Sequence, residues 1–126
     1  MPYFPELAIS PLSVTAVGAS GAAVTLTLPA VSGMYHYLCC LQITQYAAAA
    51  TTGAATPVTV TTTNLPGSPA FTFPTALAIG TENQQVVQPH ALLQSSAVGT
   101  ATTVVCPATT GIIWRVTAWY GAFPGP

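Results

Sequence analysis

The sequence predicts an all-β fold, a single antiparallel β-sandwich of about seven to nine short strands. Segments rich in Thr, Val and Ile recur along the chain, and these residue types favour strands. Clusters of Gly, Pro, Ser and Asn separate the segments and mark turns. No segment shows the periodicity of an amphipathic helix of ordinary length. The spacing suits a jelly-roll-like or immunoglobulin-like sandwich, but the immunoglobulin pattern of Cys, Trp and Cys is missing, since no Trp lies between Cys40 and Cys106.

The length of 126 residues corresponds to one domain. We expect a proline-rich extended arm at residues 1–13, the sandwich at residues 14–122 and a short tail at residues 123–126. The arm contains three prolines, which lack a backbone donor and favour extended conformations. Such a segment cannot pair as an ordinary central strand.

The strands before residue 100 are predicted from alternation, because successive side chains of a strand point to opposite faces. Residues 23–28 should direct Val24, Leu26 and Leu28 into the core. The longest candidate is residues 34–46, whose predicted core face is Tyr35, Tyr37, Cys39, Leu41 and Ile43. Residues 47–56 should form a loop. Further short strands are expected at residues 57–63, 70–73, 76–80, 84–88 and 91–95.

The most strongly patterned strand is predicted at residues 111–120. One face is apolar throughout, and we expect it to face the core: Ile112, Trp114, Val116, Ala118 and Tyr120. The other face mixes Ile113, Arg115, Thr117 and Trp119, and this mixture suits a surface that meets another protein. A strand at residues 101–106 and a short link precede it, which predicts that the two strands form a hairpin.

Charged side chains are scarce. Glu6, Glu82 and Arg115 are the whole set, 2% of residues against about 25% in an ordinary domain. A protein that stays dispersed at high concentration normally carries more charge. Either Thr, Ser, Gln and Asn hydrate the surface, or other subunits cover much of it, and we favour the second explanation. A single arginine excludes ordinary nucleic-acid binding and a polybasic membrane anchor.

Neither a membrane span nor a secretory signal is expected. The chain contains no apolar run of about 18 residues. Its first residues lack the basic and apolar regions of a signal peptide. We therefore expect the protein to be made and retained in a cytosol.

Titratable side chains are too few to suggest catalysis. His36 and Cys40 lie four positions apart, a spacing that separates them by about 13 Å on a strand. Phosphate loops, nucleophile elbows and paired metal-ligand motifs are missing. We expect no enzyme activity, catalytic residue, cofactor, metal or small-molecule substrate. Structural roles are expected for His36 and His90, and Cys39, Cys40 and Cys106 should be reduced, buried apolar residues.

Three stretches, Thr61–Gly67, Thr102–Pro107 and Ile113–Tyr120, resemble small β-sandwich structural proteins of tailed bacteriophages, in particular head decoration or cement proteins. The resemblance covers Tyr35–Tyr120. It implies a non-enzymatic protein of the virion, made in the host cytoplasm, that clamps major capsid subunits on the capsid surface, often as a homotrimer. Many such proteins carry more acidic residues, so minor capsid, tail and host-recognition roles remain open.

The interface candidates combine the arm with residue types enriched at protein–protein interfaces. They are Pro2, Tyr3, Phe4, Pro5, Arg115, Trp119 and Phe123. A lone cation is costly to bury without a partner. We therefore expect Arg115 to form a buried ion pair with Glu82 or Glu6, or to bind a carboxylate or carbonyl of an adjacent subunit.

An alternative function is a carbohydrate- or receptor-binding β-sandwich on a virion tail or surface. Trp119 with Tyr3, Tyr46 or Tyr120 would then form an aromatic platform for a sugar ring. Such sites also need polar side chains that bind hydroxyl groups, and these are few in this chain.

Overall fold

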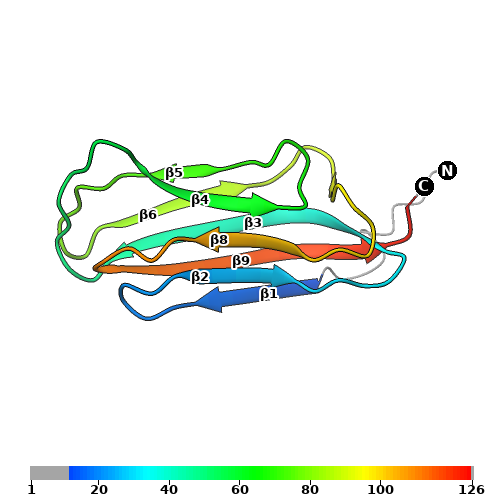
Figure 1. The fold of residues 1–126 in the computed structure, drawn as a ribbon, viewed down its shortest axis with the longest axis horizontal. Helices are drawn as coiled ribbons and strands as arrows, with labels where there is room; N and C mark the ends of the chain where they lie inside the picture. The colour runs from blue at the N-terminus through cyan, green and yellow to red at the C-terminus, as the bar shows by residue number, and fades with distance from the viewer. Residues whose placement is uncertain (1–11, 126) are drawn as a thin grey trace.

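The computed structural model describes residues 12–125. Within this range the regular elements are strands, without a helix, and they run along the long axis of the molecule (Figure 1). The strands are β1 (Leu12–Val17), β2 (Val24–Leu28), β3 (Tyr35–Ala47), β4 (Val58–Thr63), β5 (Phe71–Phe73), β6 (Glu82–Val87), β7 (Leu93–Gln94), β8 (Thr102–Cys106) and β9 (Ile112–Phe123).

The strands form two antiparallel sheets that share one core. Sheet A has the order β1-β9-β3-β6, with β7 also paired to β3, and sheet B has the order β2-β8-β4-β5. Hence β1 pairs with the last strand, β2 with the one before it, β3 with β6 and β4 with β5. This nested pairing is that of a jelly roll. The predicted antiparallel β-sandwich is confirmed, in its jelly-roll-like form.

Alternation correctly predicted the core faces of β2 and β9. All eight residues predicted to point inward from these strands are buried: Val24, Leu26, Leu28, Ile112, Trp114, Val116, Ala118 and Tyr120. The Trp114 ring of sheet A meets the Phe73 ring of sheet B edge to face, with ring centroids 5.1 Å apart. Aromatic pairs of this geometry stabilise a fold beyond the area that they bury, so this contact helps to hold the two sheets together.

The core face predicted for β3 is right in its second half and wrong in its first. Tyr35, Tyr37 and Cys39 are only half-buried. The register of β3 against β9 shifts between Leu38 and Cys40, which marks a β-bulge with one extra residue. Because side chains alternate, one extra residue moves every preceding side chain to the opposite face. The two tyrosines therefore lie on the outer face of sheet A.

The predicted hairpin between β8 and β9 is wrong. β8 pairs with β2 and β4 in sheet B, whereas β9 pairs with β1 and β3 in sheet A. The link at residues 107–111 crosses between the sheets. Gly111 has φ 81°, a conformation that favours glycine, and Trp114 Nε1–H donates to the Pro107 carbonyl at 3.0 Å. A short link of this kind serves equally well for a hairpin and for a corner between two sheets.

Four of the short strands lie at or close to their predicted positions: β4, β5 and β7 fall within residues 57–63, 70–73 and 91–95, and β6 overlaps residues 84–88. The turn after β4 is closed by the Ser68 N–H, which donates to the Leu65 carbonyl at 3.1 Å. β1 begins at Leu12, inside the segment predicted as an arm. The rest of the arm, residues 1–11, lies outside the described residues. The segment predicted as a strand at residues 76–80 forms only an isolated bridge between Leu77 and Thr51.

Candidate interaction surfaces

The outer face of sheet B is a surface of threonines. Strand alternation and register place these side chains away from the core: Thr25, Thr27, Thr59, Thr61, Thr63, Thr72 and Thr103. The hydroxyls of Thr63 and Thr103 are hydrogen-bonded at 2.6 Å. None of the strand residues on this face is charged, so its polar side chains are hydroxyl groups in place of ionic groups.

The outer face of sheet A carries an aromatic cluster where β9 ends. We define this aromatic cluster as Tyr35, Tyr37, Trp119 and Phe123, all half-buried. The register pairs Tyr35 with Phe123. The rings of Tyr37 and Phe123 pack edge to face, with centroids 5.8 Å apart. Two of the predicted interface residues, Trp119 and Phe123, thus belong to this cluster. Its two tyrosines were not among the predicted interface residues, because the alternation of β3 gives no sign of the bulge.

Gly121 allows the aromatic cluster to form. A Cβ atom at this position would lie 2.5 Å from the Phe123 ring, which is closer than real Cβ contacts occur. The ring of Phe123 therefore folds back over the backbone of its own strand. A glycine inside a strand often marks such a close approach.

The same outer face has a polar hollow at the opposite half of β9. This polar hollow has a volume of about 440 Å³ and is lined by Gln42, Thr44, Tyr46, Glu82, Gln84, Ile113 and Arg115. Its residues come from three neighbouring strands, β9, β3 and β6. Both charged side chains of residues 12–125 lie in it.

Arg115 and Glu82 share the polar hollow without forming an ion pair. Arg115 lies opposite Thr44 on β3, and Thr44 lies opposite Gln84 on β6, so β3 separates the two charges. Neighbouring strands are about 4.8 Å apart, which places the Cα atoms of Arg115 and Glu82 about 10 Å or more from each other. Both side chains are exposed, so the expected buried ion pair with Glu82 is not formed within the chain. Glu6 lies outside the described residues.

The polar side chains of the hollow differ from their neighbours in hydrogen bonding. Gln45 Nε2–H donates to the Pro74 carbonyl at 3.1 Å, and its Oε1 accepts from Asn83 Nδ2 at 3.0 Å. Gln85 Nε2–H donates to the Thr72 carbonyl at 2.6 Å. In contrast, none of the six polar side chains that line the polar hollow hydrogen-bonds to another described residue. They remain available to a ligand.

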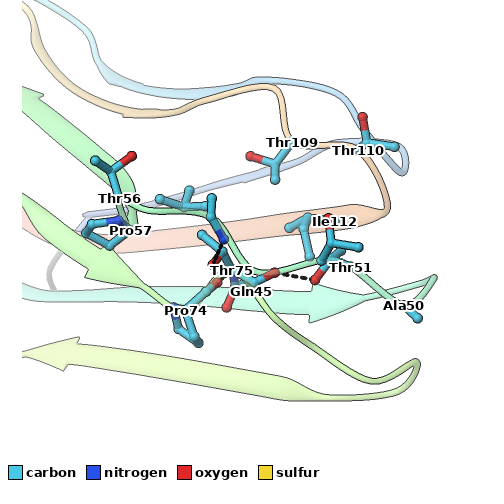
Figure 2. Close-up of a pocket in the computed structure, with 13 residues that line it drawn as sticks. Gln45, Ala50, Thr51, Thr56, Pro57, Pro74, Thr75, Thr109, Thr110 and Ile112 are labelled. Carbon is cyan, nitrogen blue, oxygen red and sulfur yellow. Dashed lines mark hydrogen bonds between the residues drawn. The ribbon is translucent and has the colours of Figure 1, made fainter.

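A second pocket, of about 460 Å³, lies beside the links between the sheets (Figure 2). Four of its seven polar side chains are hydrogen-bonded within the protein: Gln45, Thr51, Thr75 and Thr109. The Thr51 hydroxyl donates to the Thr75 carbonyl at 2.5 Å, and the Thr75 hydroxyl accepts from the Ala54 N–H at 2.9 Å (Figure 2). Both polar atoms of Gln45 are also bonded. These hydrogen bonds hold the loops that border the pocket, and no charged side chain lines it.

The polar hollow is lined by none of the described histidines and cysteines, and none of them belongs to the aromatic cluster. His36 is buried and His90 is exposed. Burial raises the pKa of the Cys106 thiol to about 12, whereas Cys39 and Cys40 are half-buried. Among residues 12–125, no three His, Cys, Asp or Glu side chains are grouped to hold a metal ion. No helix in this part of the chain could cross a membrane.

The aromatic platform expected around Trp119 is not formed with Tyr120 or with Tyr46, and its third candidate, Tyr3, lies outside the described residues. Tyr120 is buried and stacks edge to face on His36. Tyr46 lies opposite Ile113, six residues before Trp119, which is about 20 Å along a strand. Tyr46 instead borders the polar hollow. The other candidates, Pro2, Tyr3, Phe4 and Pro5, lie outside the described residues.

The fold and these surfaces define the class of the protein as a jelly-roll β-sandwich with a charge-poor exterior. No protein-family model matches the chain, and no curated protein is similar to it.

Proposed function

We propose that this chain is a non-enzymatic structural protein of a virion. It binds the outside of a phage capsid as an oligomer and stabilises contacts between major capsid subunits. The aromatic cluster on sheet A is its attachment surface, together with the residues that precede β1. The major capsid protein and further copies of the chain are its partners.

The aromatic cluster is the observation that carries this proposal. Four aromatic side chains lie on the outer face of sheet A towards the end of β9, and the rings of two of them, Tyr37 and Phe123, are in contact. Buried aromatic residues supply much of the binding energy at protein–protein interfaces. Since only three side chains of the whole protein are charged, attachment must rest on apolar contacts and hydrogen bonds.

The fold adds support of a weaker kind. Jelly rolls occur in viral capsid proteins and in lectins, but a fold by itself does not assign a function. The resemblance of three short stretches to phage decoration proteins points to the first of these groups. The half-buried aromatic cluster is consistent with a surface that another subunit covers.

The test is the occupancy of purified virions. Trp119→Ala should leave the isolated protein folded, because the side chain is not part of the core, and should reduce the number of copies bound per particle. Ile79→Ala is the matched control, because Ile79 is an apolar residue that is 70% exposed in a loop. Hundreds of wild-type copies per particle support a decoration role. A protein that is absent from particles, or a Trp119 variant with unchanged occupancy, would refute this attachment surface.

A further inference from the structure

We propose that the polar hollow on sheet A binds an uncharged saccharide. This function is additional to attachment and uses a different part of the sheet. Arg115 and Trp119 lie four positions apart on β9, about 13 Å along a strand. The polar hollow and the aromatic cluster are therefore separate sites on the outer face of sheet A.

The combination of donors and acceptors selects the chemical class of the ligand. The Arg115 guanidinium only donates hydrogen bonds and the Glu82 carboxylate only accepts them, while the amides of Gln42 and Gln84 do both. A hydroxyl group donates and accepts, so a polyhydroxylated ligand satisfies every member of this set. Phosphate or another anion would be opposed by Glu82, and a cation would be opposed by Arg115. The opposite charges cancel, which favours a neutral ligand.

The apolar side chains that line the hollow suit the C–H groups of a sugar ring. Tyr46 is 38% exposed and Ile113 is half-buried, and the two lie opposite each other on β3 and β9. Together they give the hollow an apolar side against which the C–H groups of a pyranose can pack. The volume of about 440 Å³ falls within the range of small-molecule sites, about 300–1,000 Å³.

The polar hollow is also held in a defined geometry. Its floor belongs to β3, which is paired on one side with β9 and on the other with β6. Gln45 of β3 and Asn83 of β6 alternate along their strands with residues that line the hollow, and a hydrogen bond joins these two side chains. Rigid strands position a binding site more accurately than loops do, so little order has to be gained when a ligand binds.

The binding test is a titration of the ¹⁵N-labelled protein followed by NMR. The probes are maltose, lactose and methyl α-mannoside as neutral saccharides, with glucuronate and inorganic phosphate as anions. Each is added up to about 50 mM, because single weak sites have dissociation constants in the millimolar range. We expect a neutral saccharide to shift the side-chain amides of Gln42 and Gln84. The Gln45 amide and the Trp119 indole are internal controls and should not move.

Two substitutions then test the pairing of donor and acceptor. Glu82→Gln and Arg115→Gln should each weaken saccharide binding about tenfold, since each removes a charge-assisted hydrogen bond. Both positions are exposed, so the variants should fold normally. Trp119→Ala should leave saccharide binding unchanged while it lowers virion occupancy, which separates this inference from the proposed function.

The possible results are decisive. Shifts that are confined to the polar hollow and caused by a neutral saccharide support the inference. Shifts caused only by glucuronate or phosphate would show an anion site and overturn it. The absence of shifts with all three neutral saccharides would also overturn it, as would equal affinity of the wild-type protein and both variants.

Discussion

His36 Nδ1 lies 2.7 Å from the Thr102 hydroxyl oxygen, and this contact joins the two sheets through a buried polar pair. His36 is in β3 of sheet A and Thr102 is in β8 of sheet B. The Nε2 atom of His36 is 2.8 Å from the Pro29 carbonyl, which can only accept, so Nε2 carries the proton. In neutral His36, Nδ1 therefore accepts from the Thr102 O–H, and Thr102 in turn accepts from Asn64 Nδ2 at 3.1 Å.

Thr102→Val should lower the free energy of unfolding by about 1–3 kcal/mol. The substitution keeps the volume of the side chain but leaves the buried Nδ1 of His36 without a partner, which costs roughly this amount. Thr102→Ser retains the hydroxyl and should lose less. Thr27→Val is the control, because Thr27 faces outward on the neighbouring strand, and exposed substitutions usually change stability by less than about 0.5 kcal/mol. Urea unfolding of the four proteins measures the differences. Equal midpoints for Thr102→Val and Thr27→Val would contradict this role.

Asn64 should stabilise the fold both through the hydrogen bonds of its side chain and through the conformation of its backbone. Its φ is 60°, and its side chain binds the loop before β8 through the Ala97 N–H at 2.8 Å and the Thr100 carbonyl at 3.1 Å. Asn64→Gly removes these bonds and keeps the conformation accessible, whereas Asn64→Ala also adds about 1 kcal/mol of strain. Both variants should be destabilised, and the alanine variant more so. Thermal unfolding that ranks the glycine variant as the less stable would show that strain at this position is unimportant.

The parts of the fold that the sequence predicted depend on local pattern. The alternation in β2 and β9 is unbroken, and every residue predicted to face the core from these strands is buried. The bulge at Cys39 has no such signal, because an extra residue in a strand looks like a continuation of it. The pairing of β8 and β9 with different sheets depends on contacts with β2, β4, β1 and β3, which the short link cannot encode.

The candidate surfaces were predicted only in part, and the reason is the same. Trp119 and Phe123 were identified as interface candidates from residue type, but their neighbours Tyr35 and Tyr37 were assigned to the core. Arg115 was expected to pair with Glu82 or Glu6, the two acidic residues of the sequence, or with a group of an adjacent subunit. The true relationship of Arg115 and Glu82, on opposite sides of one hollow with β3 between them, follows from the strand order of sheet A. That order is set by the nesting of distant strands and has no local signature.

Stability should fall at alkaline pH through Cys106. Burial raises the pKa of this thiol from 9.0 to about 12 in the folded state. Above about pH 9 the unfolded chain loses the thiol proton while the folded protein keeps it, so the unfolded state binds fewer protons and stability decreases with pH, by about 1.4 kcal/mol per unit. The contribution of Cys106 is full below pH 9 and is lost as pH rises towards 12. Cys106→Val should lack this component. Parallel slopes of unfolding free energy against pH for the two proteins would contradict the assignment.

Binding to particles should depend little on monovalent salt. With only three charged side chains, the protein offers little Coulombic attraction for ions to screen. Occupancy of shells should therefore be similar at low and high sodium chloride, in contrast to the behaviour of a protein attached by ion pairs. A large loss of occupancy at high salt would show that Glu6, Glu82 or Arg115 is paired with the partner.

The residues before β1 should contribute to attachment. Residues 1–11 contain three prolines and two aromatic side chains, Tyr3 and Phe4. Proline reduces the entropy that such a segment loses when a partner immobilises it. The segment joins the sheet beside the aromatic cluster, since Ser13 is the register partner of Trp119. Deletion of Met1–Leu7 should leave a folded protein with the wild-type melting temperature and much lower virion occupancy.

A matched variant separates the contribution of the aromatic side chains from that of the length of the segment. Replacing Tyr3 and Phe4 by Ser keeps the length and the prolines, and it should reduce occupancy nearly as much as the deletion if these rings fill pockets on a neighbouring subunit. Circular dichroism and thermal unfolding report the fold, and the number of copies per purified particle reports attachment. A deletion that unfolds the protein would mean that residues 1–7 stabilise their own sandwich. Unchanged occupancy would mean that attachment rests on the aromatic cluster alone.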